Sequence, residues 1–310
     1  MEFESKDNYA ADQGGAQGRP DIATDSSGSV TRADDRRDLH ESASDIFAPL
    51  AETEKVPGVE YAILIENLTK TYGPKAAVND LTLRVPKGSF FGFLGPNGAG
   101  KTTTIKILMG LAQATSGRVE MLGRTIDIHS FDVRQRIGVV LDDSLLFDRL
   151  TGREYLQFVG RIYGLERGVV DKRVKELLDL FELTSSRHKV IAEYSKGMKK
   201  RIAMGAALIH RPTLFLMDEP FEGVDAVGAR LMKEILLDRV RHGCTVFLTS
   251  HVLEVVERLC ERLAIIHEGK LVLEGTMDEL RAGGSDQDTL EEIFVRTVGG
   301  DAVPDRLDWL

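Results

Sequence analysis

The sequence has few cysteines and no long apolar run. Its 310 residues include only Cys244 and Cys260, whose spacing fits neither a disulfide framework nor a zinc-ligand pair. No stretch approaches the about 18 consecutive apolar residues that a membrane-spanning helix requires. A basic excess is also missing, since 40 Lys and Arg stand against 49 Asp and Glu. General nucleic-acid binders use such an excess to neutralise phosphates, so we expect no nucleic-acid partner.

The N-terminal residues lack the features of a targeting signal and of a folded domain. The first twenty residues are acidic and rich in Gly and Gln, without the apolar core of a secretory signal, so we expect a cytosolic protein. Residues 1–58 contain 13 Asp and Glu against 6 Lys and Arg and show no sustained apolar periodicity. Such a segment buries too little surface to offset its ordering entropy. We therefore predict a disordered acidic tail over 1–58, in which residues 46–50 could form a short docking motif.

From residue 61 onward, strand-like and helix-like patterns alternate. Apolar runs predict strands, and 3.6-residue periodicity predicts helices, over the segments that follow. Strands are expected at 61–65, 81–85, 90–94, 213–217, 244–250 and 263–267, and a loop with a strand at 135–141. Helices are expected at 101–111, 151–183, 195–210, 227–240 and 251–259. This alternation predicts an α/β fold with a mostly parallel sheet, and a helix-rich insertion at about 146–205.

A glycine-rich loop follows the strand at 90–94. Its residues, Gly95-Pro96-Asn97-Gly98-Ala99-Gly100-Lys101-Thr102, fit the P-loop pattern G-x-x-x-x-G-K-[ST]. Glycines allow backbone N–H groups to surround an anion at the start of a helix. Lys101 is expected to reach the β- and γ-phosphates, Thr102 to ligate Mg²⁺, and Thr103 to contact a phosphate. A tight glycine turn with an exposed lysine is the simpler alternative.

A second acidic motif follows the apolar strand at 214–217. The strand leads into Asp218 and Glu219, which should therefore lie at the carboxyl edge of the sheet, where α/β folds bind ligands. We expect Asp218 to hold Mg²⁺ through water and Glu219 to polarise an attacking water as a general base. The alternative is an acidic pair in a turn before Pro220.

The order and spacing of these motifs resemble the nucleotide-binding subunit of an ABC transporter, from about residue 60 to residue 280. Residues 194–201, Tyr-Ser-Lys-Gly-Met-Lys-Lys-Arg, resemble the family signature L-S-G-G-Q. Ser195 and Gly197 keep the two positions that contact a γ-phosphate. Lys196 and Met198 depart from the usual Gly and Gln, as in variants of the exporter branch.

Other family positions follow from the same resemblance. Tyr72 resembles the aromatic residue that stacks on adenine, although a structural tyrosine is the alternative. Asp225, in Glu-Gly-Val-Asp, resembles part of the D-loop that crosses to a second subunit. His251 resembles the switch histidine that contacts the γ-phosphate. Asp142 stands where the family usually has a Gln that touches Mg²⁺ and the attacking water, and a carboxylate can also bind this metal.

The resemblance implies a P-loop NTPase fold with an antiparallel N-terminal β portion and a helical subdomain. The domains would be a tail at 1–58, an ATPase cassette at 59–282 and a linker with a short helix at 283–310. The implied cofactors are ATP and Mg²⁺. The implied partners are a second copy, bound head to tail through ATP, and a separate polytopic membrane subunit that meets residues 146–155 at the cytoplasmic face. The implied activity is ATP hydrolysis that energises transport, with export as its direction.

Two other functions are compatible with a P-loop. A non-transport ABC ATPase of translation or DNA repair usually carries two cassettes, a coiled coil or zinc-binding insertions, which this sequence lacks. A regulatory module without turnover would not need Lys101, Asp218, Glu219 and His251 together, although Asp142 leaves this alternative open.

Overall fold

A six-stranded sheet forms the centre of the molecule. The computed structural model describes residues 60–127, 130–141, 146–282 and 288–299, so the predicted tail at 1–58 lies outside it. The strand order is β10-β9-β3-β8-β7-β6, with all neighbours parallel except β10 and β9. The predicted mostly parallel sheet is therefore confirmed. The strands are β3 (Phe90–Leu94), β6 (Ile137–Val140), β7 (Leu214–Asp218), β8 (Thr245–Ser250), β9 (Arg262–His267) and β10 (Lys270–Thr276).

The central strands are covered on both faces, which explains their uninterrupted apolar sequences. Every residue of β3, β7 and β8 is buried. Strands buried on both faces are continuous apolar runs because neither face meets water. Phe91 and Phe247 stack across β3 and β8 with ring centroids 5.9 Å apart. The strand ends that carry Asp218 and lead into the P-loop are thus fixed by a packed core.

A second, antiparallel sheet covers one face of the central sheet. Its order is β2-β1-β4-β5, and its strands are β1 (Tyr61–Tyr72), β2 (Lys75–Pro86), β4 (Ser116–Met121) and β5 (Arg124–Thr125). Together with α3 (Lys101–Leu108), it encloses an apolar cluster against residues of the central strands. The short helix α4 (Phe131–Arg134) precedes β6. The sequence predicted only parts of β1 and β2 and missed β4, β5 and β10.

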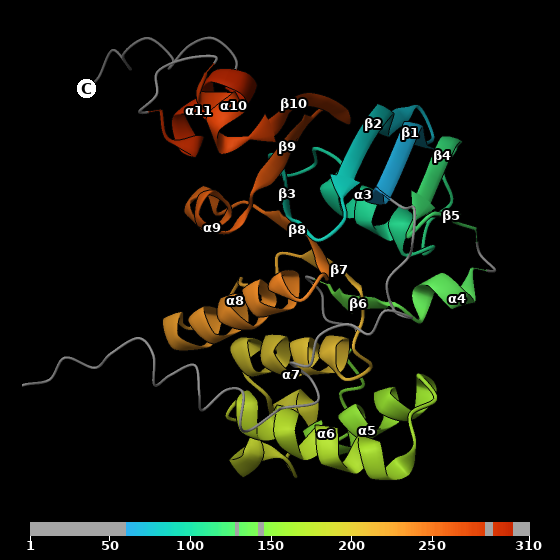
Figure 1. Cartoon of the computed structure of the whole chain (residues 1–310), viewed down its shortest axis with the longest axis vertical. Helices are drawn as coiled ribbons and strands as arrows, with labels where there is room; N and C mark the ends of the chain where they lie inside the picture. Colours follow the sequence, from blue (N-terminus) through green and yellow to red (C-terminus); the bar gives the residue numbers. More distant parts are fainter. Residues whose placement is uncertain (1–59, 128–129, 142–145, 283–287, 300–310) are drawn as a thin grey trace, which may run out of the picture.

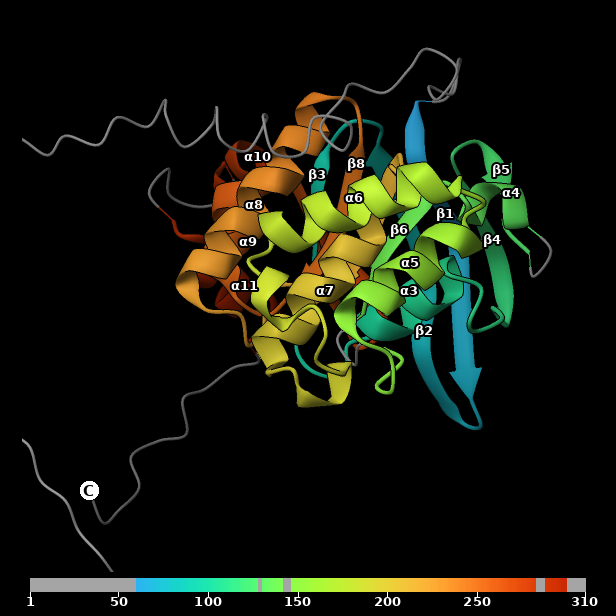
Figure 2. The same cartoon turned by 90° about the horizontal axis from the view of Figure 1, so that it is seen from below.

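The helices gather mainly on the other face of the central sheet. Figure 1 shows α7 between the sheet and the α5–α6 pair, and Figure 2 shows α8 and α9 on the side away from β1, β2 and β4. The bounds are α5 (Gly152–Ile162), α6 (Arg167–Leu180), α7 (Lys196–Leu208), α8 (Ala226–Arg241), α9 (Leu253–Leu259), α10 (Met277–Arg281) and α11 (Leu290–Val298), with single 3-10 turns at Thr184–Ser186 and Ile191–Glu193. The helical segment expected at 151–183 is therefore two helices. Gly164, at φ 73°, makes the turn between them.

Side-chain caps set where several helices begin. Thr151 and Glu154 form a reciprocal capping box at the start of α5. Ser195 accepts a hydrogen bond from the backbone N–H of Met198 and so caps α7. These caps satisfy backbone N–H groups that have no partner within the helix. The Ser195 cap, which the sequence predicts, thus fixes where the signature residues lie at the start of α7.

The structure also bears on membrane insertion. Among the helices in the described part of the chain, none is both long enough and apolar enough to span a membrane.

A partly buried histidine joins three elements of the helical side. The His210 ring stacks on Tyr163 with a centroid distance of 3.6 Å and an angle of 6° between the rings. Its Nε2 lies 3.1 Å from the carbonyl oxygen of Ile137, at the start of β6. Burial lowers the pKa of His210 from its usual 6.5 to about 4. The neutral ring is therefore the form that fits the folded protein.

His210 should make stability depend on pH. Because its pKa is lower in the folded state than in the unfolded state, the unfolded chain binds the extra proton between about pH 6.5 and 4. The stabilising contribution is complete above pH 6.5, and we expect it to be lost at up to about 1.4 kcal/mol per pH unit as the pH falls. Urea unfolding of His210→Gln should show a shallower pH dependence in this window than the parent. An unchanged slope in His210→Gln would contradict the assignment.

Candidate nucleotide-binding site

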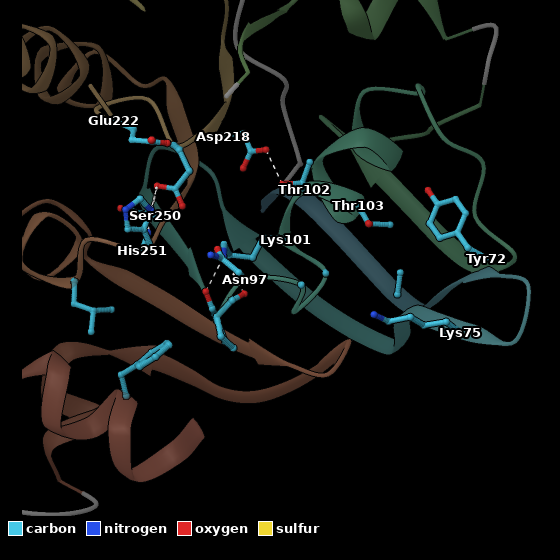
Figure 3. A pocket seen from close by; sticks show the side chains of 18 residues that line it. Tyr72, Lys75, Asn97, Lys101, Thr102, Thr103, Asp218, Glu222, Ser250 and His251 are labelled. Atoms are coloured by element: carbon cyan, nitrogen blue, oxygen red, sulfur yellow. Dashed lines mark hydrogen bonds and ion pairs between the residues drawn. The ribbon is translucent and has the colours of Figure 1, made fainter. Parts of the chain in front are cut away.

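A cavity of about 840 Å³ lies at the carboxyl ends of β3, β7 and β8. This is the edge at which parallel α/β sheets bind ligands, and the volume is in the usual range for a small-molecule site. Figure 3 shows Tyr72 at one end, His251 and Glu222 at the other, and Lys101 between them. The residues that line it are Tyr72, Lys75, Ala77, Gly95, Pro96, Asn97, Gly98, Gly100, Lys101, Thr102, Thr103, Asp218, Glu219, Glu222, Ser250, His251, Leu253 and Phe294.

Glycines shape the loop that forms the floor of this cavity. Gly98 and Gly100 have φ values of 80° and 115°, which residues other than glycine rarely adopt. A Cβ atom on Gly95 would lie 2.3 Å from the carbonyl oxygen of Ile266. The β9–β10 turn supports the loop from behind, because the N–H of Gly269 donates to the carbonyl of Ala99 at 2.9 Å. Ala99 itself is buried and does not line the cavity.

Lys101, the first residue of α3, places an ammonium group inside the cavity. Its Nζ donates to the carbonyl oxygens of Gly95 at 2.6 Å and Pro96 at 3.2 Å. Burial lowers the pKa of Lys101, while the carboxylates of Glu219 and Asp218 oppose this shift. A cation beside the N-terminus of a helix is a strong attractor for a polyphosphate. The predicted phosphate-binding role of Lys101 thus fits its position.

Thr102 and Asp218 meet at the side of the cavity. The Thr102 hydroxyl donates to Oδ2 of Asp218 at 2.8 Å, and the Thr249 hydroxyl donates to Oδ1 of the same carboxylate. A hydroxyl beside a carboxylate is a donor set that suits Mg²⁺, which prefers oxygen ligands and commonly takes one or two from the protein. No group of three or more His, Cys, Asp or Glu side chains that could hold a metal occurs within the described ranges. Among the described residues, Thr102 and Asp218 are therefore the side chains that would hold a magnesium ion, together with water and phosphate oxygens.

Glu219 and His251 form a pair at the mouth of the cavity. Glu219 Oε2 accepts from the backbone N–H of His251 at 3.2 Å and lies 3.0 Å from Nδ1 of its ring. The Glu219 side chain is 13% exposed, whereas the His251 side chain is 52% exposed. Glu219 has φ 48°, an uncommon value for a residue with a side chain, and such strained positions concentrate at functional sites. The two residues are thus close enough to act on one phosphate group together.

Tyr72 provides an exposed ring at the opposite end. It is the last residue of β1 and is 53% exposed. The Lys70 ammonium lies 4.8 Å from the ring centroid. A flat ring held beside a phosphate-binding loop can stack on a base. The cavity can therefore hold a nucleotide with its base near Tyr72 and its last phosphate near Glu219.

Other predicted site residues lie outside this cavity. Ser195 and Gly197 form the first turn of α7, where a Cβ on Gly197 would lie 3.1 Å from the carbonyl oxygen of Gly223. Asp225 caps α8 by accepting from the N–H of Gly228 at 2.9 Å, and this hydrogen bond, with Arg201 nearby, lowers its pKa. None of the three lines the cavity of the same chain. Asp142 lies outside the described residues.

Several residues of the cavity wall were not predicted from the sequence. Lys75 pairs with Tyr72 across the β1–β2 hairpin, and its position could have been inferred from the turn at Gly73 and Pro74. Glu222 and Ser250 flank predicted residues along the chain. Phe294 comes from α11, far along the sequence, and no local pattern connects it to a P-loop.

Removal of the Lys101 ammonium tests the phosphate assignment. Lys101→Ala should weaken ATP binding and reduce turnover by about 100-fold each, because charge-assisted contacts to the phosphates are lost. Calorimetry and phosphate release measure the two effects. Lys106→Ala, at an exposed lysine of the same helix, is the control and should behave like the parent. Normal hydrolysis by Lys101→Ala would refute the assignment.

Comparisons with known proteins agree with this site. Residues 78–222 match the family model described as ABC transporter. The chain is 40% identical over 232 residues to the linearmycin resistance ATP-binding protein LnrL of Bacillus subtilis (strain 168), covering 74% of each chain. It is 38% identical over 224 residues to the bacitracin transport ATP-binding protein BcrA of Enterococcus faecalis, covering 72% of this chain and 71% of that protein.

A solved structure shares the fold over most of its length. The structure of the ATP-binding subunit of an ABC transporter superposes with a TM-score of 0.72 at 29% identity, covering 76% of this chain and 99% of that one. Its fold, together with the relatives above and the geometry of the P-loop, Asp218 and Glu219, identifies the chain. It belongs to the ABC transporter family as an ATP-binding subunit, and it is an ATPase.

Proposed function

We propose that two copies of this chain bind head to tail and enclose ATP between them. The observation that supports this most directly is the location of the signature residues. Ser195 and Gly197 resemble phosphate-contacting positions, yet they do not line the cavity formed by their own P-loop. A second copy could supply them to the open mouth of the cavity, beside Glu219 and His251. One chain would then hold half of each catalytic site.

In this proposal each residue has a distinct task. The P-loop and Lys101 bind and orient the phosphates, and Tyr72 positions the base. Thr102 and Asp218 would hold Mg²⁺, which would supply positive charge to neutralise the phosphates. Glu219 accepts a proton as the oxygen of water bonds to the γ-phosphorus and the bond to the ADP oxygen breaks. His251, in contact with Glu219, holds the γ-phosphate in place.

The γ-phosphate would control association of the two copies. ATP can favour the closed dimer only through contacts that ADP lacks, and the γ-phosphate is the group that differs. Its contacts with His251 of one copy and Ser195 of the other would be lost on hydrolysis. Opening and closing would move the α5–α6 pair with α7, and this motion would be passed to a membrane subunit.

Glu219→Gln separates ATP binding from hydrolysis. The amide keeps the shape of the side chain but cannot accept the proton, so turnover should fall by about 100-fold or more while ATP affinity is retained. Dimers should accumulate with ATP and dissociate with ADP, as measured by light scattering. Glu254→Gln, at an exposed glutamate of α9, is the control and should hydrolyse ATP normally. Parental turnover in Glu219→Gln would rule out this residue as the base.

We further propose that an aromatic surface at the start of the helical subdomain contacts a separate polytopic membrane subunit at the cytoplasmic face. This surface consists of Phe147, Phe158 and Ile162, which are 54%, 40% and 63% exposed. Phe147 packs edge-on against Phe158 at a centroid distance of 5.1 Å. Clustered exposed apolar groups are typical of interaction sites. The resistance and transport functions in the names of the relatives support export as the direction.

Replacement of one aromatic residue tests this surface. Phe147→Ser should leave the ATPase activity of the isolated chain unchanged, because Phe147 does not line the nucleotide cavity. It should reduce co-purification with the membrane subunit by about tenfold, as expected for an aromatic residue at the centre of an interface. Phe131→Ser, at an exposed phenylalanine of α4, serves as the matched control and should retain the complex. Equal recovery of the complex with both variants would contradict the proposed surface.

A further inference from the structure

A lysine that carries no predicted role lies buried behind the catalytic edge of the sheet. Lys200 belongs to α7, five positions after the cap Ser195, and is only 1% exposed. A lysine is rarely buried unless its charge is compensated, because loss of water destabilises the ammonium group. Its neighbour Lys199 shows the ordinary arrangement, with a partly exposed side chain 3.4 Å from Asp148. Two of the contacts that Lys200 makes are with main-chain carbonyl oxygens.

The Lys200 ammonium faces the ends of two neighbouring strands. Its Nζ donates to the carbonyl oxygen of Leu141 at 3.1 Å and lies 3.5 Å from that of Asp218. Val140 and Met217 are paired in the parallel register of β6 and β7, and the two carbonyls belong to the residues that directly follow them. Lys200 thus joins both strand ends to α7, which lies alongside them (Figure 1).

One of these strand ends carries the carboxylate of the proposed magnesium site. The Asp218 side chain accepts from Thr102 and Thr249 on the cavity side, while its main chain is approached by Lys200 from the helix side. Groups that orient a metal ligand affect metal affinity and rate even without touching the metal. The same helix is capped by Ser195, which is the proposed contact for the γ-phosphate of a second copy.

We propose that Lys200 is a positioning residue for ATP hydrolysis, which fixes the ends of β6 and β7 against the signature helix and so sets the position of Asp218. The inference rests on the proposed role of Asp218 in binding Mg²⁺. It assigns to Lys200 no contact with nucleotide or metal. Since the Lys200 ammonium contacts two carbonyl oxygens, this role requires both the length of the side chain and its hydrogen-bond donors.

Two substitutions test this role. Lys200→Met keeps the length of the side chain but removes its donors, and we expect kcat to fall by about tenfold and the Mg²⁺ concentration for half-maximal activity to rise by about tenfold. ATP affinity measured without a divalent cation should stay within about twofold of the parent, because the P-loop and Tyr72 are unaltered. Lys200→Gln keeps N–H donors on a shorter side chain and should be intermediate in both quantities.

A binding measurement without turnover gives a second readout. The affinity for Mn²⁺, measured by electron paramagnetic resonance with a non-hydrolysable ATP analogue, should weaken by about tenfold in Lys200→Met. Lys199→Met, the same substitution at the next position of α7, is the matched control and should match the parent throughout. The dependence of ATP hydrolysis on a divalent cation is measured first in the parent protein. Hydrolysis by the parent without any divalent cation would refute the magnesium site itself.

The alternative is a lysine that only stabilises the fold. A lower unfolding temperature in Lys200→Met with parental kcat, Mg²⁺ dependence and Mn²⁺ affinity would overturn the proposal. If Lys200→Met does not fold, Lys200→Gln decides by the same measurements. Parental values in that variant would overturn the proposal, and reduced kcat with weakened metal affinity would support it.

Discussion

The site depends on one buried carboxylate. Asp218 is 2% exposed and ends a strand that is buried along its whole length. A carboxylate in such a place must be hydrogen bonded, because an unpaired buried charge is strongly destabilising. Thr102 at the start of α3 and Thr249 on β8 supply those bonds. The hydrogen bonds of this one side chain therefore connect α3, β7 and β8 at the edge of the sheet that forms the site.

Around this carboxylate, charge is arranged to receive an anion. The Lys101 side chain and the N-terminus of α3 provide positive potential. Burial lowers the pKa of Lys101, and the carboxylates of Glu219 and Asp218 oppose this shift. Electrostatic interactions are stronger in a site with little water than at an exposed surface. The overall excess of acidic residues does not weaken this, since the site depends on local groups. A triphosphate can thus bind to an acidic protein.

The start of the signature helix is fixed by contacts within its own chain. Ser195 caps α7 within its own chain, and Gly197 allows the first turn of this helix to approach Gly223 closely. These contacts fix the helix start independently of any nucleotide. A rigid, pre-formed helix N-terminus is suited to bind the phosphate of a neighbouring molecule without a further ordering cost. Our dimer proposal therefore requires only that two pre-formed surfaces meet.

By itself, the sequence determined the P-loop, the acidic pair at the end of β7 and the mostly parallel sheet. These features are local: glycines at positive φ, apolar runs and caps act over a few residues. Tertiary structure alone decided the antiparallel strands β4 and β5, the edge strand β10, and the presence of Phe294 in the cavity wall. It also decided the burial of Lys200 and the contact between Glu219 and His251. Such features depend on which segments, far apart in the sequence, pack together in the fold. A pattern that extends over only a few residues does not determine this packing.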